Sequence, residues 1–277
     1  MNGIAGRIPD SGPVRALVLD WAGTAVDYGC VGPVVVFIEV FRRQGVQVTT
    51  PEARGPMGLM KKDHLRAMCR TASVAEKWRS VHHRDPRETD VDAMYADVEP
   101  LMVSCVVRHA EPITGAVETV ARFRQAGLKI GSSTGYTTPM MDVLVPESAR
   151  RGYRPDSIVC SSDVPAGRPA PWMCYLNAIN LCVYPMEAMV KIGDTVSDIQ
   201  EGRNAGMWTI GVTKTGNELG LTEAEVAALA PAELRARLEA IADRLRAAGA
   251  HYIAESIQEC PEIVDIINDR LARGERP

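Results

Sequence analysis

Short apolar runs alternate along most of the chain with segments in which apolar residues recur every three or four positions. Short apolar runs bounded by turn residues are typical of strands buried on both faces of a parallel sheet. They predict strands over residues 14–19, 128–132, 157–160, 188–192 and 208–212. Helices are predicted between the strands, over residues 33–45, 115–126, 138–152 and 170–181. This alternation predicts an α/β fold with a doubly wound parallel sheet.

One long stretch interrupts the alternation. Residues 50–109 show helical periodicity only, with turn signals at Pro51, Pro86 and Pro112. We therefore predict a helical insert over residues 31–110, within an α/β core made of residues 14–30 and 111–277. An insert that follows the first strand lies above the carboxyl ends of the strands, where it can act as a cap.

The two ends of the chain carry different patterns. Residues 1–13 are rich in glycine and proline and lack the apolar stretch of a signal peptide, so they are predicted to form a flexible leader. From residue 222 onward the pattern predicts two amphipathic helices and a short strand near residues 251–254.

The composition narrows the class of protein. With 277 residues, 46% of them apolar and 24% charged, the chain is expected to form a globular protein of two domains. The formal net charge of −4 gives no reason to expect nucleic-acid binding, and no apolar run approaches the roughly 20 residues that span a bilayer. The seven cysteines lack CxxC spacing, which favours free thiols in a reducing compartment over a zinc site. We expect a cytoplasmic protein that has no membrane or nucleic-acid partner.

Polar residues follow the predicted strands, where ligands gather in open α/β sheets. Asp20 follows the first strand, and its carboxylate is suited to attack phosphorus; the alternative is a loop aspartate that caps a turn. The run Ser132-Ser133-Thr134-Gly135 offers hydroxyl and backbone N–H groups to phosphate oxygens, although such runs are usually ordinary loops.

Two further charged motifs complete the set. Arg168 precedes a predicted helix and is suited to neutralise phosphate charge, although a loop arginine is usually just solvated. Asp194 and Asp198 share one loop after the strand at 188–192, and two carboxylates there suit Mg²⁺, which prefers oxygen ligands. The alternative is that Asp194 or Ser197 caps the N-terminus of the next helix.

These four motifs, in this order over residues 14–212, resemble the core of the haloacid dehalogenase (HAD) superfamily. Most phosphatases of that superfamily carry a second aspartate two residues after the nucleophile, as general acid for an alkoxide leaving group. This chain has Ala22 at that position. Either the acid has been lost together with the activity, or the leaving group is handled in another way.

A lysine in the insert offers such a way. If the chain is helical from about Pro56, then Met57, Lys61 and His64 lie on one face of that helix. A lysine in a partly dry cleft loses some of its preference for the charged form and can attack a carbonyl to form a Schiff base. From helix position alone, an exposed lysine beside Lys62 is the commoner outcome.

The wider pattern resembles the phosphonoacetaldehyde hydrolase family, a branch of the HAD superfamily. The resemblance covers about residues 14–270 and is specific, because ordinary HAD phosphatases do not combine Ala22 with Lys61. Two departures are small: Ala25 and Ser133 stand where the family commonly has threonine. The matching motifs are Asp20–Thr24, Val26–Cys30, Pro56–Lys61 with Asp63 and His64, Ser133–Thr137, Asp163–Pro169, Gly193–Asp198 and Glu201–Trp208.

This resemblance implies hydrolysis of the C–P bond of phosphonoacetaldehyde, a small molecule, as a step in 2-aminoethylphosphonate degradation. Lys61 would form a Schiff base with the aldehyde, and Asp20 would attack phosphorus. The resemblance implies Mg²⁺ on Asp20, the backbone carbonyl of Ala22 and Asp194, with Asp198 supporting the metal through water.

The remaining implied roles concern substrate contacts and assembly. Thr134, Gly135 and Arg168 would hold the phosphonyl oxygens. Four residues would tune or orient Lys61 or carry protons to the enamine: Cys30, Met57, His64 and Tyr136. The resemblance also implies a homodimer formed through the insert.

Two alternative functions remain open. Another HAD reaction, such as phosphate monoester hydrolysis or a phosphomutase reaction, would need an acid that Ala22 does not supply. A catalytically inactive scaffold that binds a partner would be expected to have lost Asp20, Asp194 or Arg168, and the chain retains all three.

Overall fold

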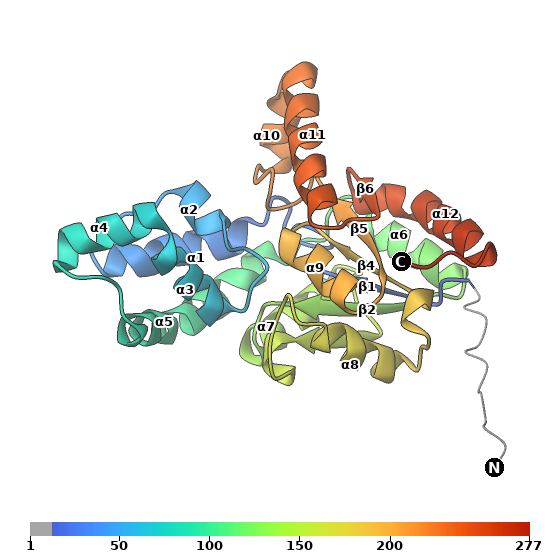
Figure 1. The fold of residues 1–277 in the computed structure, drawn as a ribbon, viewed down its shortest axis with the longest axis horizontal. Helices are drawn as coiled ribbons and strands as arrows, with labels where there is room; N and C mark the ends of the chain where they lie inside the picture. Colours follow the sequence, from blue (N-terminus) through green and yellow to red (C-terminus); the bar gives the residue numbers. More distant parts are fainter. Residues whose placement is uncertain (1–12) are drawn as a thin grey trace, which may run out of the picture.

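The computed structural model describes residues 13–277, so the predicted leader lies outside the described residues except for Pro13. Figure 1 shows an α/β body with a group of helices, α1 to α5, beside it. None of the helices in the described part of the chain is both long and apolar enough to cross a membrane.

The sheet has six strands in the order β3-β2-β1-β4-β5-β6, and every neighbouring pair is parallel. The first strand lies inside the sheet and the chain builds outward on both sides of it, which confirms the predicted doubly wound topology. The strands are β1 (Ala16–Leu19), β2 (Lys129–Thr134), β3 (Ser157–Cys160), β4 (Met189–Gly193), β5 (Trp208–Val212) and β6 (Tyr252–Ala254).

The register of the sheet brings the polar strand ends together. Leu19 pairs with Ser132 on one side and with Ile192 on the other. Parallel strands in this register end at the same edge of the sheet. The loops after β1, β2 and β4 therefore start side by side.

Twelve α-helices accompany the sheet in residues 13–277. They are α1 (Val31–Arg43), α2 (Thr50–Arg54), α3 (Lys61–Arg70), α4 (Ala72–His82), α5 (Glu88–Val106), α6 (Ala116–Gln125), α7 (Thr138–Arg150), α8 (Trp172–Leu181), α9 (Val196–Asn204), α10 (Glu223–Ala228), α11 (Pro231–Ala247) and α12 (Cys260–Ala272). Short 3₁₀ helices occupy Val107–His109, Ser161–Asp163, Met186–Ala188 and Ile257–Glu259.

The C-terminal part holds three helices, so the prediction of two was wrong. Thr222 caps α10 by accepting a hydrogen bond from the Glu225 N–H, and α10 ends at Ala228. Pro231 then begins α11. Leu229 and Ala230 between them have extended backbone, with ψ angles of 144° and 136°, and the residue before a proline favours such angles. These two residues separate α10 from α11.

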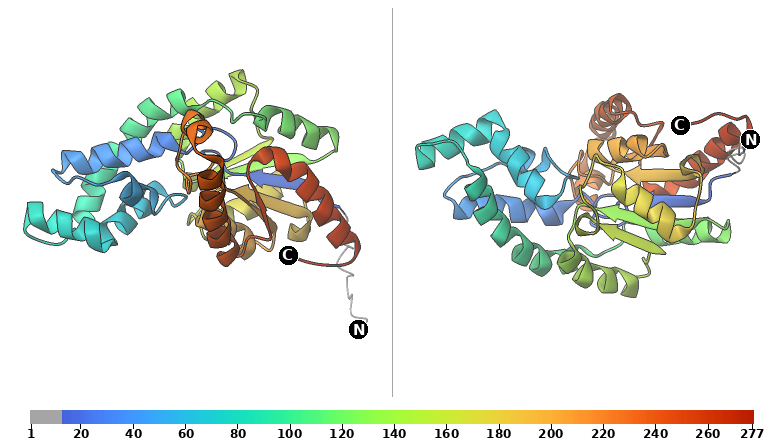
Figure 2. Two further views of the ribbon diagram at one scale, coloured as in Figure 1. Left: turned by 90° about the horizontal axis from the view of Figure 1, so that it is seen from above. Right: turned by 60° about the horizontal axis from the view of Figure 1, so that its bottom comes forward.

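Helices cover both faces of the sheet. Alternate residues of β1 enter different clusters, because side chains of a strand point to opposite faces. Leu17 and Leu19 pack with residues of α6, α7 and α12, whereas Ala16 and Val18 pack with residues of α8. Residues of α9 and α11 form a third cluster. Figure 2 shows the sheet between these helices.

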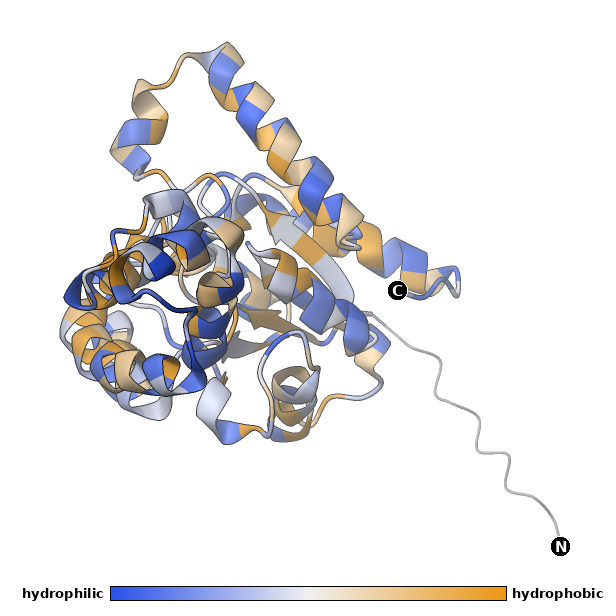
Figure 3. Ribbon diagram, turned by 60° about the vertical axis from the view of Figure 1, so that its left-hand side comes forward, coloured by the Kyte–Doolittle hydropathy of each residue, from blue (hydrophilic) through white to orange (hydrophobic). Residues whose placement is uncertain are grey.

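The helices α1 to α5 pack around large apolar side chains that are fully buried, in a cluster that also contains Leu17 and Leu19 of β1. The rings of Phe41 and Trp78 meet edge to face, with centroids 6.3 Å apart. Met94 of α5 and Phe37 of α1 belong to the same cluster. Figure 3 shows hydrophilic and hydrophobic residues alternating around these helices, as expected where one face of each helix is buried.

The chain passes between the α/β body and these helices twice, once before α1 and once after α5. Hydrogen bonds connect the two passages. The Asp27 carboxylate, on the first passage, accepts hydrogen bonds from Nδ1 of His109, on the second, and from the N–H of Gly32, each at 3.0 Å. The backbone N–H of Asp27 also donates to the carbonyl of Glu111. The hydrogen bond to Asp27 raises the pKa of His109 to about 10.

This pair predicts a pH-dependent contribution to stability. A histidine whose pKa is raised on folding stabilises fully below its unfolded pKa of about 6.5, and the stabilisation disappears as the pH rises through the folded pKa. In urea unfolding, His109→Asn is expected to cost about 1 kcal/mol at pH 6, because solvent partly screens the pair. The deficit relative to the unmodified protein should shrink steadily toward pH 10.

His83→Asn is the matched control, because His83 is exposed and lies outside both passages. It should show no pH-dependent deficit. A deficit in His109→Asn that stays constant from pH 6 to pH 10 would contradict the assigned role of the charged pair.

Candidate active site

Asp20 lies directly after β1, at the edge where the strand ends meet. Its backbone N–H donates to the carbonyl of Ile192 at 2.9 Å, which holds the residue against the end of β4. Its carboxylate forms an acidic cluster with Asp194 and Asp198, in which one oxygen of each residue lies within 4.8 Å of the others. All three residues are buried.

Arg168 and Lys191 supply positive charge around this cluster. Arg168 reaches Asp20 at 2.7 Å, Asp198 at 3.0 Å and Glu201 at 2.9 Å. Lys191, which is fully buried in β4, reaches Asp198 at 2.7 Å. These ion pairs connect Asp20, the predicted nucleophile, to a network of buried charged side chains.

The charges of this set do not balance. Four buried carboxylates (Asp20, Asp194, Asp198 and Glu201) surround two cationic side chains. Burial, together with the carboxylates of Asp20 and Asp198, raises the pKa of Asp194 well above its usual range. A divalent cation would favour the charged forms of these carboxylates, and carboxylate oxygens suit Mg²⁺. The residues present therefore fit a divalent metal.

The backbone around Asp194 supports the same interpretation. Asp194 accepts hydrogen bonds from the N–H of Asn217 at 2.6 Å and from Oγ1 of Thr24 at 3.2 Å. Gly23 has a φ of 87° and lies so close to the Asp194 carboxylate that a Cβ there would overlap it. No hydrogen bond within residues 13–277 uses the carbonyl oxygen of Ala22, which leaves that oxygen available as a ligand.

Lys61 enters the site from the other side. It is the first residue of α3 and is only 5% exposed. Its Nζ lies 4.5 Å from the centre of the Tyr136 ring and 5.9 Å from that of Phe37. Burial lowers the pKa of Lys61 to about 8. The amine is still mostly protonated at pH 7, but its unprotonated, nucleophilic fraction is far larger than that of an ordinary lysine.

The prediction of a helix from Pro56 was wrong. Residues 55–58 form turns, residues 59 and 60 are not helical, and Gly58 has a φ of 91°, which a helix does not allow. Met57 and Lys61 reach the same cavity because this loop folds over the core. A Cβ on Gly135 would lie 2.7 Å from the carbonyl oxygen of Leu59, so the loop rests directly on the backbone after β2.

His64 lies apart from the other predicted residues. It is fully buried, its Nε2 contacts the carbonyl of Ala53 at 2.9 Å, and its ring stacks on Phe37 with centroids 3.7 Å apart. Burial and the nearby charge of Lys61 lower its pKa well below the usual range. A neutral His64 therefore supports the helices that carry Lys61, and it does not line the cavity.

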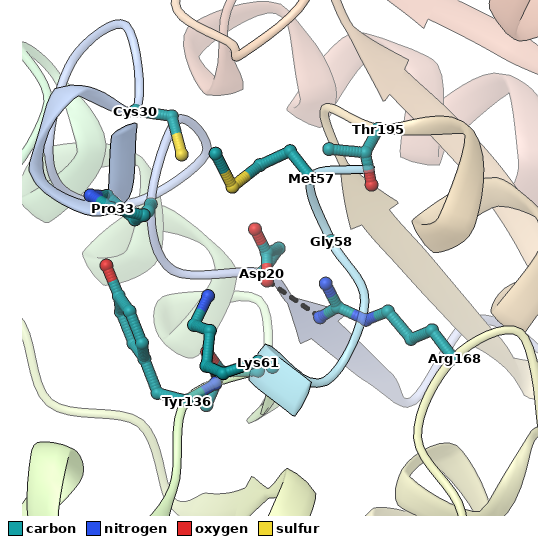
Figure 4. Close-up of a pocket in the computed structure, with 12 residues that line it drawn as sticks. Asp20, Cys30, Pro33, Met57, Gly58, Lys61, Tyr136, Arg168 and Thr195 are labelled. Carbon is teal, nitrogen blue, oxygen red and sulfur yellow. Dashed lines mark hydrogen bonds and ion pairs between the residues drawn. The ribbon is translucent and has the colours of Figure 1, made fainter. Parts of the chain in front are cut away.

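A small cavity separates the acidic cluster from Lys61, and Figure 4 shows Asp20 and Lys61 facing each other across it. Burial raises the pKa values of the Cys30 thiol and the Tyr136 hydroxyl in its wall, so both stay protonated. The lining residues are Asp20, Ala22, Cys30, Pro33, Met57, Gly58, Lys61, Thr134, Gly135, Tyr136, Arg168 and Thr195.

Comparison with known proteins identifies the family. The family model described as haloacid dehalogenase-like hydrolase matches residues 14–206. A phosphonoacetaldehyde hydrolase-like protein of Syntrophobacter fumaroxidans is 62% identical over 97% of both chains. A phosphonoacetaldehyde hydrolase of Bacillus cereus is 50% identical over 92% of this chain and 96% of its own. This chain belongs to the phosphonoacetaldehyde hydrolase family.

A solved structure agrees with this assignment. The crystal structure of a phosphonoacetaldehyde hydrolase-like protein from Oleispira antarctica matches with a TM-score of 0.94 and 38% identity, covering 96% of this chain and 97% of that one. The family membership makes the chain a HAD-like hydrolase, and HAD hydrolases generally use a divalent metal.

Two charged residues of the buried network, Lys191 and Glu201, have no role among the predictions from the sequence. Glu201 accepts hydrogen bonds from Arg168 Nε and Ser133 Oγ, each at 2.9 Å, and is fully buried. A signal was present for Lys191, because an ionisable residue between Val190 and Ile192 interrupts an apolar strand. Such a lysine must find a buried partner, since an unpaired buried charge is very costly.

The buried network predicts a large effect of Lys191→Met. The substitution keeps an unbranched side chain of similar size but leaves Asp198 and Glu201 without one of their cationic partners. We expect urea unfolding at neutral pH to show a loss of about 3–5 kcal/mol, typical of a broken buried ion pair.

Lys214→Met is the control, because Lys214 pairs with Glu255 at the surface, where both side chains are at least 36% exposed. Its expected loss is below about 1 kcal/mol. Equal losses in the two variants would show that the buried ion pairs contribute no more to the free energy of unfolding than a surface ion pair does.

Proposed function

We propose that this protein hydrolyses the carbon–phosphorus bond of phosphonoacetaldehyde to acetaldehyde and phosphate, as a step in 2-aminoethylphosphonate degradation. The observation that carries the proposal is the placement of an amine with a lowered pKa, Lys61, in the same cavity as Asp20, with alanine at position 22. Relatives at 60% and 50% identity are named phosphonoacetaldehyde hydrolase.

Lys61 solves the problem of the leaving group. Direct cleavage of the C–P bond would expel a carbanion, which is a very poor leaving group. The neutral amine of Lys61 instead adds to the aldehyde carbon and, with loss of water, forms a protonated imine. When the C–P bond breaks, its electron pair moves toward the imine nitrogen and produces an enamine. No general acid is needed at position 22.

Asp20 provides the nucleophile for phosphorus. Its carboxylate oxygen forms a bond to phosphorus as the C–P bond breaks, which gives an aspartyl-phosphate and the enamine. Protonation of the enamine at carbon and hydrolysis of the imine release acetaldehyde and regenerate Lys61. Water then cleaves the aspartyl-phosphate to give phosphate and free Asp20.

The remaining core residues bind and orient. Thr134 and Gly135 present hydroxyl and backbone N–H groups to the phosphonyl oxygens, and Arg168 offers its guanidinium. Asp20, the Ala22 carbonyl and Asp194 would hold Mg²⁺, with Asp198 supporting it through water. When bound, Mg²⁺ shields the nucleophile from the negative charge of the phosphonyl group and orients it.

Four residues around Lys61 take supporting roles in the proposal. Cys30, Met57 and Tyr136 line the cavity and are placed to orient the imine or to carry a proton to the enamine. His64 acts indirectly, because its contacts with Phe37 and the Ala53 carbonyl hold the helices that carry Lys61.

The organisation of the molecule forms part of the same proposal. We assign residues 31–110 as a cap domain and residues 14–30 and 111–277 as the core domain. The cap supplies Lys61 and shuts water out of the cavity. A homodimer formed through the cap and a cytoplasmic location complete the proposal.

Borohydride trapping tests the imine. Treatment with borohydride in the presence of phosphonoacetaldehyde or acetaldehyde is expected to leave a reduced adduct on Lys61, detected by peptide mapping. Because its pKa is about 8, inactivation should rise with pH to a midpoint near 8 rather than near 10.5. Lys61→Arg should abolish both the adduct and C–P cleavage.

Lys62→Arg is the matched control, because the neighbouring Lys62 forms an ion pair with Asp92 at 2.5 Å and is partly exposed. It should retain the adduct and the activity. An adduct on another residue, or full activity in Lys61→Arg, would rule out the imine mechanism.

Substitution at position 22 separates the proposed reaction from phosphate ester hydrolysis. Ala22→Asp adds a carboxylate to a cluster that already carries excess negative charge, and the carbon leaving group needs no acid. We expect unchanged or reduced phosphonoacetaldehyde turnover. A large gain, or turnover of an aryl phosphate by the unmodified protein that matches phosphonoacetaldehyde, would favour a phosphomonoesterase.

A further inference from the structure

Arg54 lies where the helices α1 to α5, the first chain passage and the core meet. It is the last residue of α2, and its guanidinium donates to the carbonyl of Gly29 at 2.8 Å and to that of Gly220 at 3.0 Å. Arg54 and Asn217 also donate hydrogen bonds to each other. Nη1 donates to Oδ1 of Asn217 at 3.1 Å, and Nδ2 of Asn217 donates to the Arg54 carbonyl at 3.3 Å.

Asn217 connects this contact to the acidic cluster. Its backbone N–H donates to Oδ2 of Asp194 at 2.6 Å, and the residue is only 3% exposed. The preceding Gly216 permits the close approach, since a Cβ there would lie 2.5 Å from the Cβ of Asp194. The backbone of Asn217 is therefore hydrogen-bonded to a carboxylate of the site, and its side chain is hydrogen-bonded to Arg54 of α2.

The bonding of Arg54 suits a structural coupling. Within residues 13–277, its hydrogen bonds go to carbonyl and amide oxygens and to no carboxylate. The guanidinium is a rigid planar fork with five donors, so it can hold several backbone carbonyls at once, which the single ammonium of lysine does less well. Arg54 does not line the cavity, so any effect on the site must pass through another residue.

We propose that Arg54 is a positioning residue that, through Asn217, couples the seating of residues 31–110 on the core to the orientation of the Asp194 carboxylate. The inference rests on the divalent-cation site proposed above. Coupling of this kind is reciprocal. A cation on Asp194 favours the seated insert, and loss of the Arg54–Asn217 pairing weakens cation binding. The carboxylate is thereby best arranged for a cation when the insert covers the cavity.

Calorimetric titration with Mg²⁺ alone tests this coupling in the full chain. Asn217→Ala keeps the backbone N–H that reaches Asp194 and removes only the side chain that reaches Arg54. We expect it to weaken Mg²⁺ binding about fivefold or more. The same substitution in an Arg54→Ala background should cause no further loss, because the partner is already absent. Arg54→Lys keeps the charge and should weaken Mg²⁺ binding as much as Asn217→Ala does. If Asn217→Ala does not fold, Arg54→Lys tests the coupling in its place.

Hydrogen exchange supplies a second readout. Mg²⁺ is expected to slow amide exchange over residues 50–60 in the unmodified protein and in the control Arg79→Ala. Arg79 is a residue of α4 that pairs with Asp85, and its side chain has no hydrogen bond to the core among residues 13–277. Asn217→Ala should lose this protection.

The outcomes separate the coupling from the metal site. If the unmodified protein binds Mg²⁺, Asp194→Asn abolishes the binding and Asn217→Ala binds as the unmodified protein does, the coupling is overturned and the metal site stands. Additive losses in the double variant also overturn the coupling. If the unmodified protein binds no Mg²⁺, the metal site fails and the coupling fails with it.

Discussion

The excess of buried negative charge at the carboxyl ends of β1 and β4 is the constraint on which the rest of the structure depends. Asp20, Asp194, Asp198 and Glu201 cannot be buried without partners, because each unpaired charge costs several kcal/mol. Arg168 supplies part of the compensation by contacting three of these four carboxylates. Asp20, Asp194 and Asp198 could hold a metal ion, which would add to this compensation.

The helices α1 to α5 depend on the same edge of the sheet. The loop at residues 55–60 rests on the core: the N–H of Gly167 approaches Sδ of Met60 at 3.0 Å, and Oγ of Ser197 donates to the Met57 carbonyl at 3.4 Å. This contact buries Lys61, and burial lowers its pKa. The helices therefore supply an amine and, by their packing, also create the dry surroundings that make the amine nucleophilic.

Much of the fold follows from local patterns in the sequence. The predicted strands at 157–160 and 208–212 match β3 and β5. Each is a short apolar run bounded by turn residues, so the sequence indicates where the strand begins and ends. The boundary at Lys61 was missed because propensity does not reveal that Gly58 adopts a left-handed backbone to bring the loop onto the core. The third C-terminal helix was not predicted, because apolar periodicity does not reveal that two extended residues, Leu229 and Ala230, separate α10 from α11.

The sequence by itself determined the family, the order of the strands along the chain and the set of motifs that end them, since these depend on residue type and spacing. Only the tertiary structure decided how those groups are charged and which of them meet. Lys191 pairs with Asp198 because α9 packs back against β4, the strand that it follows. Asp20 meets Asp194 because β4 lies beside β1, and Lys61 faces Asp20 because two segments some forty residues apart fold onto one edge. His64 shows the reverse case, since it follows Lys61 closely in sequence yet packs against Phe37 away from the cavity. Burial and electrostatic neighbours belong to the folded chain, and a linear pattern does not contain them.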